Sequence, residues 1–185
     1  MEEETEREDE RTEAVSKTTG KRAQSESVSI SQELTELEIS ITVLWNSVRR
    51  WLSKRSSSTD LNGLSDLDIF LLHMLVYRNQ PLRGSDLAFA LAIDDMHLVS
   101  YALKKLSKLE AVSSSKVGKE VFYEATETGR EHYREFHKDR ERYLEPAVLF
   151  LSESSIDFAT LNAALRALSG AYEQAARSAA AAKGD

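Results

Sequence analysis

Apolar residues recur every three or four positions in three long stretches of the chain, which predicts amphipathic helices over residues 31–54, 128–151 and 154–177. In each stretch they form a narrow seam, with polar residues on the opposite face. The seams could pack on one another within one chain. Contact with the same seams of a second copy is the simpler arrangement, so we expect a homodimer. The residues expected at its interface are Leu37, Ile41, Leu44, Trp45, Val48, Phe158, Leu161, Leu165, Leu168 and Tyr172.

The middle of the chain has a different pattern, typical of shorter and more buried elements. Residues 65–79 are apolar on almost every side, which indicates a helix at the centre of a domain. A short helix over 85–92, a turn over 93–95 and a second helix over 95–109 follow, with Asp94 as the expected N-cap. Small residues are needed where these two helices cross, and Ala88, Ala90, Ala92 and Ala102 are placed to supply them.

Residues 111–125 change to an alternating pattern, which predicts a β-hairpin with its turn at Lys116–Lys119. Ser or Thr followed three residues later by an acid suggests that helices begin at Ser65, Thr128 and Ser154. Pro146 should kink or end the helix that contains it.

These elements predict a mainly α-helical protein with a small β-hairpin, in which long dimerisation helices flank a winged helix-turn-helix. We expect a disordered acidic tail over 1–30 and a dimerisation helix with its linker over 31–60. A DNA-binding unit follows over 64–127, and further dimerisation helices over 128–180. The tail could also serve as an acidic interaction segment.

Composition narrows the function. The chain has 185 residues and no cysteine, which excludes disulfides, thiolate catalysis and cysteine-ligated zinc. It has no apolar run long enough to cross a membrane and no apolar N-terminal stretch, so we expect a cytoplasmic protein without a membrane partner. Its net charge of −7 argues against a polyanionic partner when taken alone.

The basic charge is nevertheless concentrated between Met96 and Tyr123, where five lysines accompany two glutamates. A helix with a polar outer face, following a tight turn, has the geometry that enters a DNA major groove. Lysines suit phosphates, whereas side chains near the start of the helix suit base edges. The expected DNA-binding residues are Arg83, His97, Ser100, Tyr101, Lys104, Lys105, Lys108, Lys116 and Lys119.

Other interpretations remain open for some of these residues. Tyr101 could pack half-buried on the hairpin, and His97 could be a capping or surface histidine. Trp45 and Trp51 could stack in a ligand pocket instead of an interface. His132 and His137 are five residues apart and His73 is alone on a buried helix, so we expect no metal. No catalytic arrangement or phosphate-binding loop is evident, and we expect neither an enzyme nor a cofactor.

Two segments together resemble the helix-turn-helix of MarR-type transcription regulators, namely Ser85 to Leu91 and Leu98 to Leu106. The stretch Tyr123–Arg130 is similar to that family's last wing strand and the entry to its long helix. The resemblance covers about Leu34 to Leu168. It implies a homodimeric repressor or activator that binds a pseudo-palindromic double-stranded DNA site and is often released by a small-molecule effector.

Two features depart from the family pattern. Glu110 stands where the family usually has glycine, and the wing lacks the usual Asp-Arg pair. These departures and the acidic net charge leave an alternative function, a winged-helix protein–protein interaction module without specific DNA binding.

Overall fold

The computed structural model describes residues 30–54, 63–153 and 157–182. Its contacts divide the chain into two compact units, Met1–Phe70 and Leu71–Asp185. None of the described helices is both long enough and apolar enough to cross a membrane. The predicted disordered tail and most of the predicted linker lie outside the described residues.

The first unit contains a helix over residues 30–54, which confirms the first amphipathic stretch. Trp45 stacks on Phe70, with ring centroids 6.0 Å apart. The Arg49 guanidinium forms an ion pair of 3.0 Å with Asp66. The helix still exposes much of its apolar side, including Leu44 and Trp45.

The helix α2 (Asp66–Arg78) begins at the capping box that the sequence predicts. The Ser65 amide donates to Asp68 Oδ2 over 2.7 Å, and the Asp68 amide donates to Ser65 Oγ over 3.2 Å. Further along α2, Leu71, Leu72 and Leu75 are buried. They belong to the core of the second unit, as expected of a helix that is apolar on most sides.

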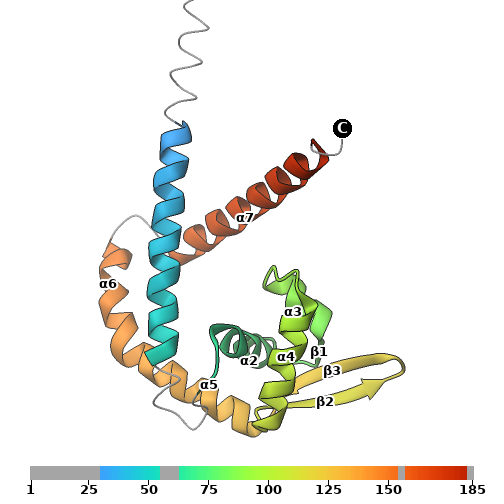
Figure 1. Cartoon of the computed structure of the whole chain (residues 1–185). Helices are drawn as coiled ribbons and strands as arrows, with labels where there is room; N and C mark the ends of the chain where they lie inside the picture. Colours follow the sequence, from blue (N-terminus) through green and yellow to red (C-terminus); the bar gives the residue numbers. More distant parts are fainter. Residues whose placement is uncertain (1–29, 55–62, 154–156, 183–185) are drawn as a thin grey trace, which may run out of the picture. The chain divides into compact units, whose positions relative to one another are not determined.

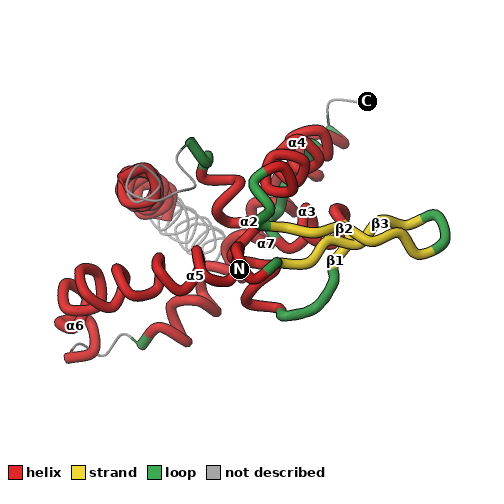
Figure 2. Tube along the Cα trace, turned by 90° about the horizontal axis from the view of Figure 1, so that it is seen from below, coloured by secondary structure: helices red, strands yellow, loops and turns green. Residues whose placement is uncertain are grey.

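A three-stranded antiparallel sheet in the order β1-β3-β2 forms the edge of this core. Its strands are β1 (Leu82–Arg83), β2 (Val112–Val117) and β3 (Glu120–Ala125). The hairpin of β2 and β3 is confirmed, and it extends beyond the neighbouring helices (Figure 2). The two-residue strand β1 was not predicted, because so short a segment carries no alternating pattern.

The hairpin turn is tighter than the sequence suggests. Lys116 and Val117, predicted to lie in the turn, are still paired in β2 with Val121 and Glu120. Only Gly118 and Lys119 join the strands, and Gly118 has φ of +63°. Glycine adopts this left-handed conformation without the steric cost that a Cβ imposes, which permits the two-residue turn.

The helix pair α3 (Gly84–Ala90) and α4 (Met96–Lys108) confirms the helix-turn-helix (Figure 1). The predicted N-cap is wrong by one residue: the side chain of Asp95, not Asp94, accepts the His97 amide over 2.8 Å. The four positions of α4 predicted to face inward are all buried, namely Val99, Ala102, Leu103 and Leu106.

Only part of the predicted small-residue crossing is correct. Ala88 and Ala102 are buried, but Ala90 and Ala92 are exposed. Gly84 also faces α4, and a Cβ there would be in ordinary contact with Leu103 Cδ1 at 3.6 Å and Met96 Cε at 3.7 Å. The Ala90 and Ala92 error arose because a run of alternating alanines does not by itself reveal which face of a helix it occupies.

The long helix begins at α5 (Glu127–Asp139), and its predicted cap is wrong. Thr126, not Thr128, is the N-cap, and its hydroxyl accepts the Gly129 amide over 3.2 Å. A π-helical segment, η1 (Arg140–Leu144), then leads into α6 (Glu145–Glu153).

Pro146 lies in the first turn of α6 and does not end the helix. It has no amide hydrogen to donate, and its ring crowds the carbonyl of the preceding turn. The Glu145 amide instead donates to the Arg140 carbonyl, five residues back, which widens the helix just before the proline. The helix axis turns between α5 and α6 (Figure 1), so the predicted kink is confirmed.

The last helix, α7 (Phe158–Ala181), starts later than predicted, since Asp157 itself is the N-cap and accepts the Thr160 amide over 2.8 Å. Ser154, the predicted partner of Asp157 in a capping pair, lies outside the described residues. No residue of α7 is buried. Its seam is left uncovered in a single chain.

Candidate nucleic-acid interface

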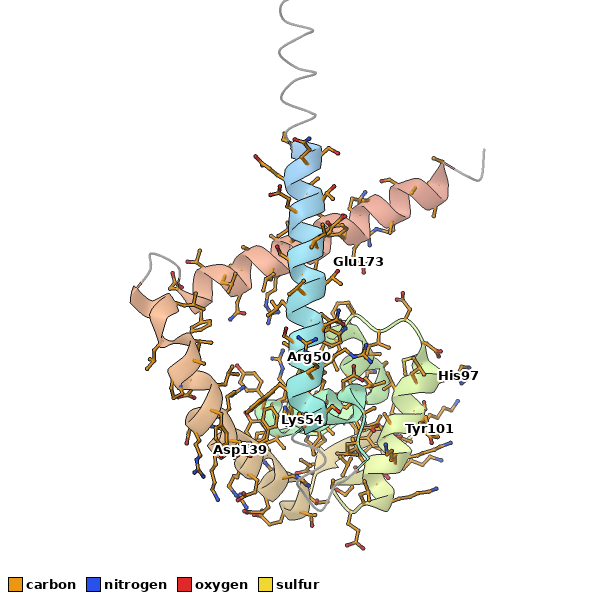
Figure 3. All side chains as sticks on the ribbon, turned by 60° about the vertical axis from the view of Figure 1, so that its left-hand side comes forward. Arg50, Lys54, His97, Tyr101, Asp139 and Glu173 are labelled. Carbon is orange, nitrogen blue, oxygen red and sulfur yellow. The ribbon has the colours of Figure 1, made fainter. Side chains whose placement is uncertain are left out.

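The outward face of α4 carries a polar stripe. His97, Tyr101, Lys104 and Lys108 follow one another at helical steps of three or four residues, so they share one side of the helix. His97 and Tyr101 stand on its outer side, away from the core (Figure 3). Tyr101 is 72% exposed, which excludes half-buried packing on the hairpin. Ser100 is also exposed beside the stripe.

The middle and C-terminal parts of α4 and the wing strands line an open hollow of about 470 Å³. Its lining consists of lysines, tyrosines and serines: Tyr101, Lys104, Lys105, Ser107, Lys108, Ser114 and Tyr123. Ser114 and Tyr123 are direct partners across β2 and β3. The hollow therefore combines ammonium groups with hydroxyl donors and has the chemistry to hold a phosphate.

Ser107, Ser114 and Tyr123 were missed by the sequence analysis, which considered charge and the outer face of one helix. The cross-strand pairing of Ser114 with Tyr123 becomes visible only once the hairpin register is known. A tight turn placed at Gly118-Lys119 would have revealed it, because the register of a hairpin follows from its turn.

The winged helix DNA-binding domain family matches residues 64–129, which contain α2 to β3 and the whole hollow. These residues thus have a winged-helix fold and are similar to that domain family. No match was found among the curated proteins.

Solved structures extend the likeness beyond the winged-helix domain. A MarR family regulator from Neisseria meningitidis matches with a TM-score of 0.63 and 15% identity, covering 78% of this chain and 96% of its own. FabT from Streptococcus pneumoniae in complex with DNA matches with a TM-score of 0.53 and 12% identity, covering 77% of this chain and 97% of its own. NadR in complex with 4-hydroxyphenylacetate matches with a TM-score of 0.55 and 20% identity, covering 70% of this chain and 87% of its own. The protein thus has the fold of MarR-type winged-helix regulators, as its sequence resemblance predicts.

The wing of this domain is less basic than its two lysines suggest. Lys116 and Lys119 are exposed at the hairpin end, but Glu120 and Glu124 lie on the adjoining strand. The strands and turn between Val112 and Ala125 therefore carry no net charge. In contrast, α4 holds three lysines and no acidic residue. By formal charge, α4 is therefore more basic than the wing strands.

Arg83 is engaged within the winged-helix domain. Its guanidinium donates to Asp86 through Nε over 3.0 Å and through Nη2 over 2.7 Å, and Nη1 lies 3.9 Å from Glu120. The Asp86 carboxylate also accepts the Arg83 amide over 3.1 Å at the start of α3. These hydrogen bonds lower the pKa of Asp86. The structure gives Arg83 a part in holding the α3 N-terminus.

His73 is not alone, contrary to what its isolated position in the sequence suggests. Its ring lies 4.5 Å from that of Phe136 and 5.1 Å from that of Tyr133, both on α5. Burial, with repulsion from Arg140, His132 and His137, lowers the pKa of His73 to about 4. Within the described part of the chain, no three His, Asp or Glu side chains gather as a metal site would require.

Proposed function

We propose that this protein is a transcription regulator that binds a specific double-stranded DNA sequence as a homodimer. The observation that carries the proposal is the lysine-rich face of α4 beside the hollow, within a domain similar to winged-helix DNA-binding domains. One helix fits into a major groove, so α4 would enter it with its exposed side toward the bases.

In this arrangement, the hollow contacts the sugar-phosphate backbone of the DNA. A phosphate seated between α4 and the wing would meet Lys104, Lys105 or Lys108 from one side and the hydroxyl groups of Ser114 and Tyr123 from the other. His97, Ser100 and Tyr101 then face the base edges. Phosphate contacts fix the position of the protein, and base contacts select the sequence.

The uncovered helices support the homodimer. On α7, the predicted interface residues Phe158, Leu161, Leu165 and Tyr172 are 55%, 38%, 37% and 42% exposed. On the first helix, Leu44 and Trp45 are 56% and 43% exposed. Leu37, Ile41, Val48 and Leu168 are partly covered. A second copy would bury these seams and pair two α4 helices for two half-sites of DNA.

A response to a small molecule is a further part of the proposal. It is supported by the fold shared with NadR, whose solved structure contains 4-hydroxyphenylacetate. An effector would regulate by binding the DNA-competent and DNA-incompetent states with different affinities.

Selection of bound sequences from random duplex DNA, followed by titration across salt concentrations, tests the function. The wild type should select one sequence and bind it with a steep salt dependence, because phosphate contacts release counterions. Lys104→Glu should abolish binding. The control Lys138→Glu makes the same change of charge on α5, away from the hollow, and should bind nearly as well as the wild type.

The interaction-module alternative is distinguished by the same experiment. Failure to select any sequence at low salt, together with recovery of one stoichiometric protein partner, would replace the DNA-binding proposal. The near-neutral wing is the feature that favours that alternative.

A further inference from the structure

The N-terminal half of α4 lacks the side chains that most often read guanine and adenine by paired hydrogen bonds. The whole helix, from Met96 to Lys108, contains no arginine, asparagine or glutamine. Arginine and lysine recognise guanine in this way, whereas asparagine and glutamine recognise adenine. The three lysines of α4 all line the hollow in its C-terminal half. In the N-terminal half, His97, Ser100 and Tyr101 can hydrogen-bond to base edges, and the other exposed side chains, Met96 and Leu98, are apolar.

That N-terminal half exposes apolar surface. Leu98 is 53% exposed, and Tyr101, one helical turn further on, is 72% exposed. The core needs neither of them, since Val99 and Leu103 on the opposite side of α4 are 0% and 1% exposed. Leu98 directly follows His97, so it stands at the edge of the polar stripe. Leu98 therefore contributes little to the packing of the core, and contact with an apolar group of a partner would remove its exposed surface from water, which is favourable.

In the major groove, the C5-methyl group of thymine is the apolar feature that distinguishes one base from another. We propose that Leu98 is a specificity-determining residue that packs on a thymine methyl group, with the ring of Tyr101 completing the contact. Each half-site then contains an A·T pair at the position facing Leu98. This inference rests on the proposed function, because it assigns the sequence preference of the same interface.

Replacement of thymine by deoxyuridine tests the contact, since it removes the methyl group and keeps the base pair. In the selected duplex, each thymine is replaced in turn and the dissociation constant is measured. At one position per half-site the wild type should bind about fourfold more weakly, the effect expected for one buried methyl group. At the remaining positions the replacement should have little effect.

Variants of Leu98 complete the experiment. Leu98→Ala should bind the thymine and deoxyuridine duplexes equally, whereas Leu98→Met should keep the preference because it keeps an apolar side chain of similar length. The control Tyr77→Ala removes an exposed side chain from α2, outside the interface and the expected dimerisation helices, and should behave as the wild type. Thermal melting should show each variant folded, because Leu98 and Tyr77 are both exposed.

Three results would overturn the inference. A selected duplex whose affinity is unchanged by every deoxyuridine replacement would exclude a methyl contact and leave the proposed function intact. A replacement penalty that persists in Leu98→Ala would assign the contact to another residue. If no sequence is selected at all, the proposed function fails together with this inference.

Discussion

Gly129 lies directly against the backbone of Ala111. A Cβ on Gly129 would overlap the Ala111 carbonyl oxygen and lie 2.9 Å from Leu72 Cδ1. The same carbonyl accepts the Thr126 amide over 3.1 Å, and the Thr126 hydroxyl donates to the Glu110 carbonyl over 2.5 Å. The start of α5 is thus fixed to the segment that follows α4, which explains why glycine occurs at position 129.

Gly129→Ala should destabilise the protein by about 1–3 kcal/mol, since a methyl group forced into a packed site displaces backbone that cannot yield easily. Gly170→Ala is a matched control in α7, where an added Cβ has no neighbour within 4 Å. That substitution should stabilise the helix by up to about 1 kcal/mol, because alanine favours helices. Urea denaturation measures both, and equal effects would contradict the assigned contact.

Glu110→Gly should stabilise the protein by about 0.5–1 kcal/mol. Glu110 has φ of +56°, where a side chain is strained, and its amide donates to the Ser107 carbonyl. The Ala111 amide donates to Leu106, which completes the Schellman motif that glycine usually closes. Glu110→Ala keeps the strained Cβ and serves as the control. A gain of similar size in the alanine variant would show that charge, not backbone conformation, is responsible.

The free energy of unfolding should decrease as the pH is lowered from about 6.5 to about 4. His73 has a pKa of about 4 in the folded protein, against 6.5 as its ordinary value. The unfolded chain therefore binds more protons in this window, and protonation favours unfolding as the pH falls. His73→Phe should flatten this part of the profile, measured by urea denaturation at several pH values. An unchanged profile in the variant would assign the pH dependence to other groups.

Leu161→Glu with Leu165→Glu should convert a dimer into monomers, because each change places a carboxylate on the uncovered seam of α7. Light scattering at micromolar concentration should show half the mass of the wild type, and DNA affinity should fall together with dimerisation. Arg166→Glu changes the net charge by the same amount as the two leucine substitutions together, but it lies next to Leu165 on another side of the helix and should remain dimeric. A wild type that is already monomeric would contradict the homodimer.

Lys116→Ala with Lys119→Ala should weaken DNA binding less than Lys104→Ala with Lys108→Ala. The wing is neutral overall, whereas the α4 lysines line the hollow without an acidic residue on their helix. Each lost phosphate contact should reduce the slope of log affinity against log salt by about one. A larger loss from the wing pair would move the main backbone contact from the hollow to the hairpin.

The sequence predicted most helices and the hairpin, because apolar periodicity reports which residues face a core. Errors occurred at helix ends and turns, at the crossing of α3 and α4, and in the missed strand β1. Asp95 and Thr126 act as caps in place of their neighbours Asp94 and Thr128, since several residues there can cap equally well. The strand β1 depends on its pairing with β3, a tertiary contact that two residues cannot signal.

For the candidate site, the sequence identified the lysines and the outer face of α4 but not the hollow that collects them. Ser114 and Tyr123 join the lysines only because β2 and β3 pair in one register. Arg83, which looks like a free cation in the sequence, is held by Asp86.

The sequence by itself determined the order of helices, the inward side of α4 and the concentration of basic charge, because these follow from local spacing. Only the tertiary structure decided how close Gly129 comes to Ala111, which hydroxyl groups meet the lysines and what surrounds His73. Those relationships join residues distant in the chain, and their distances depend on how whole elements pack.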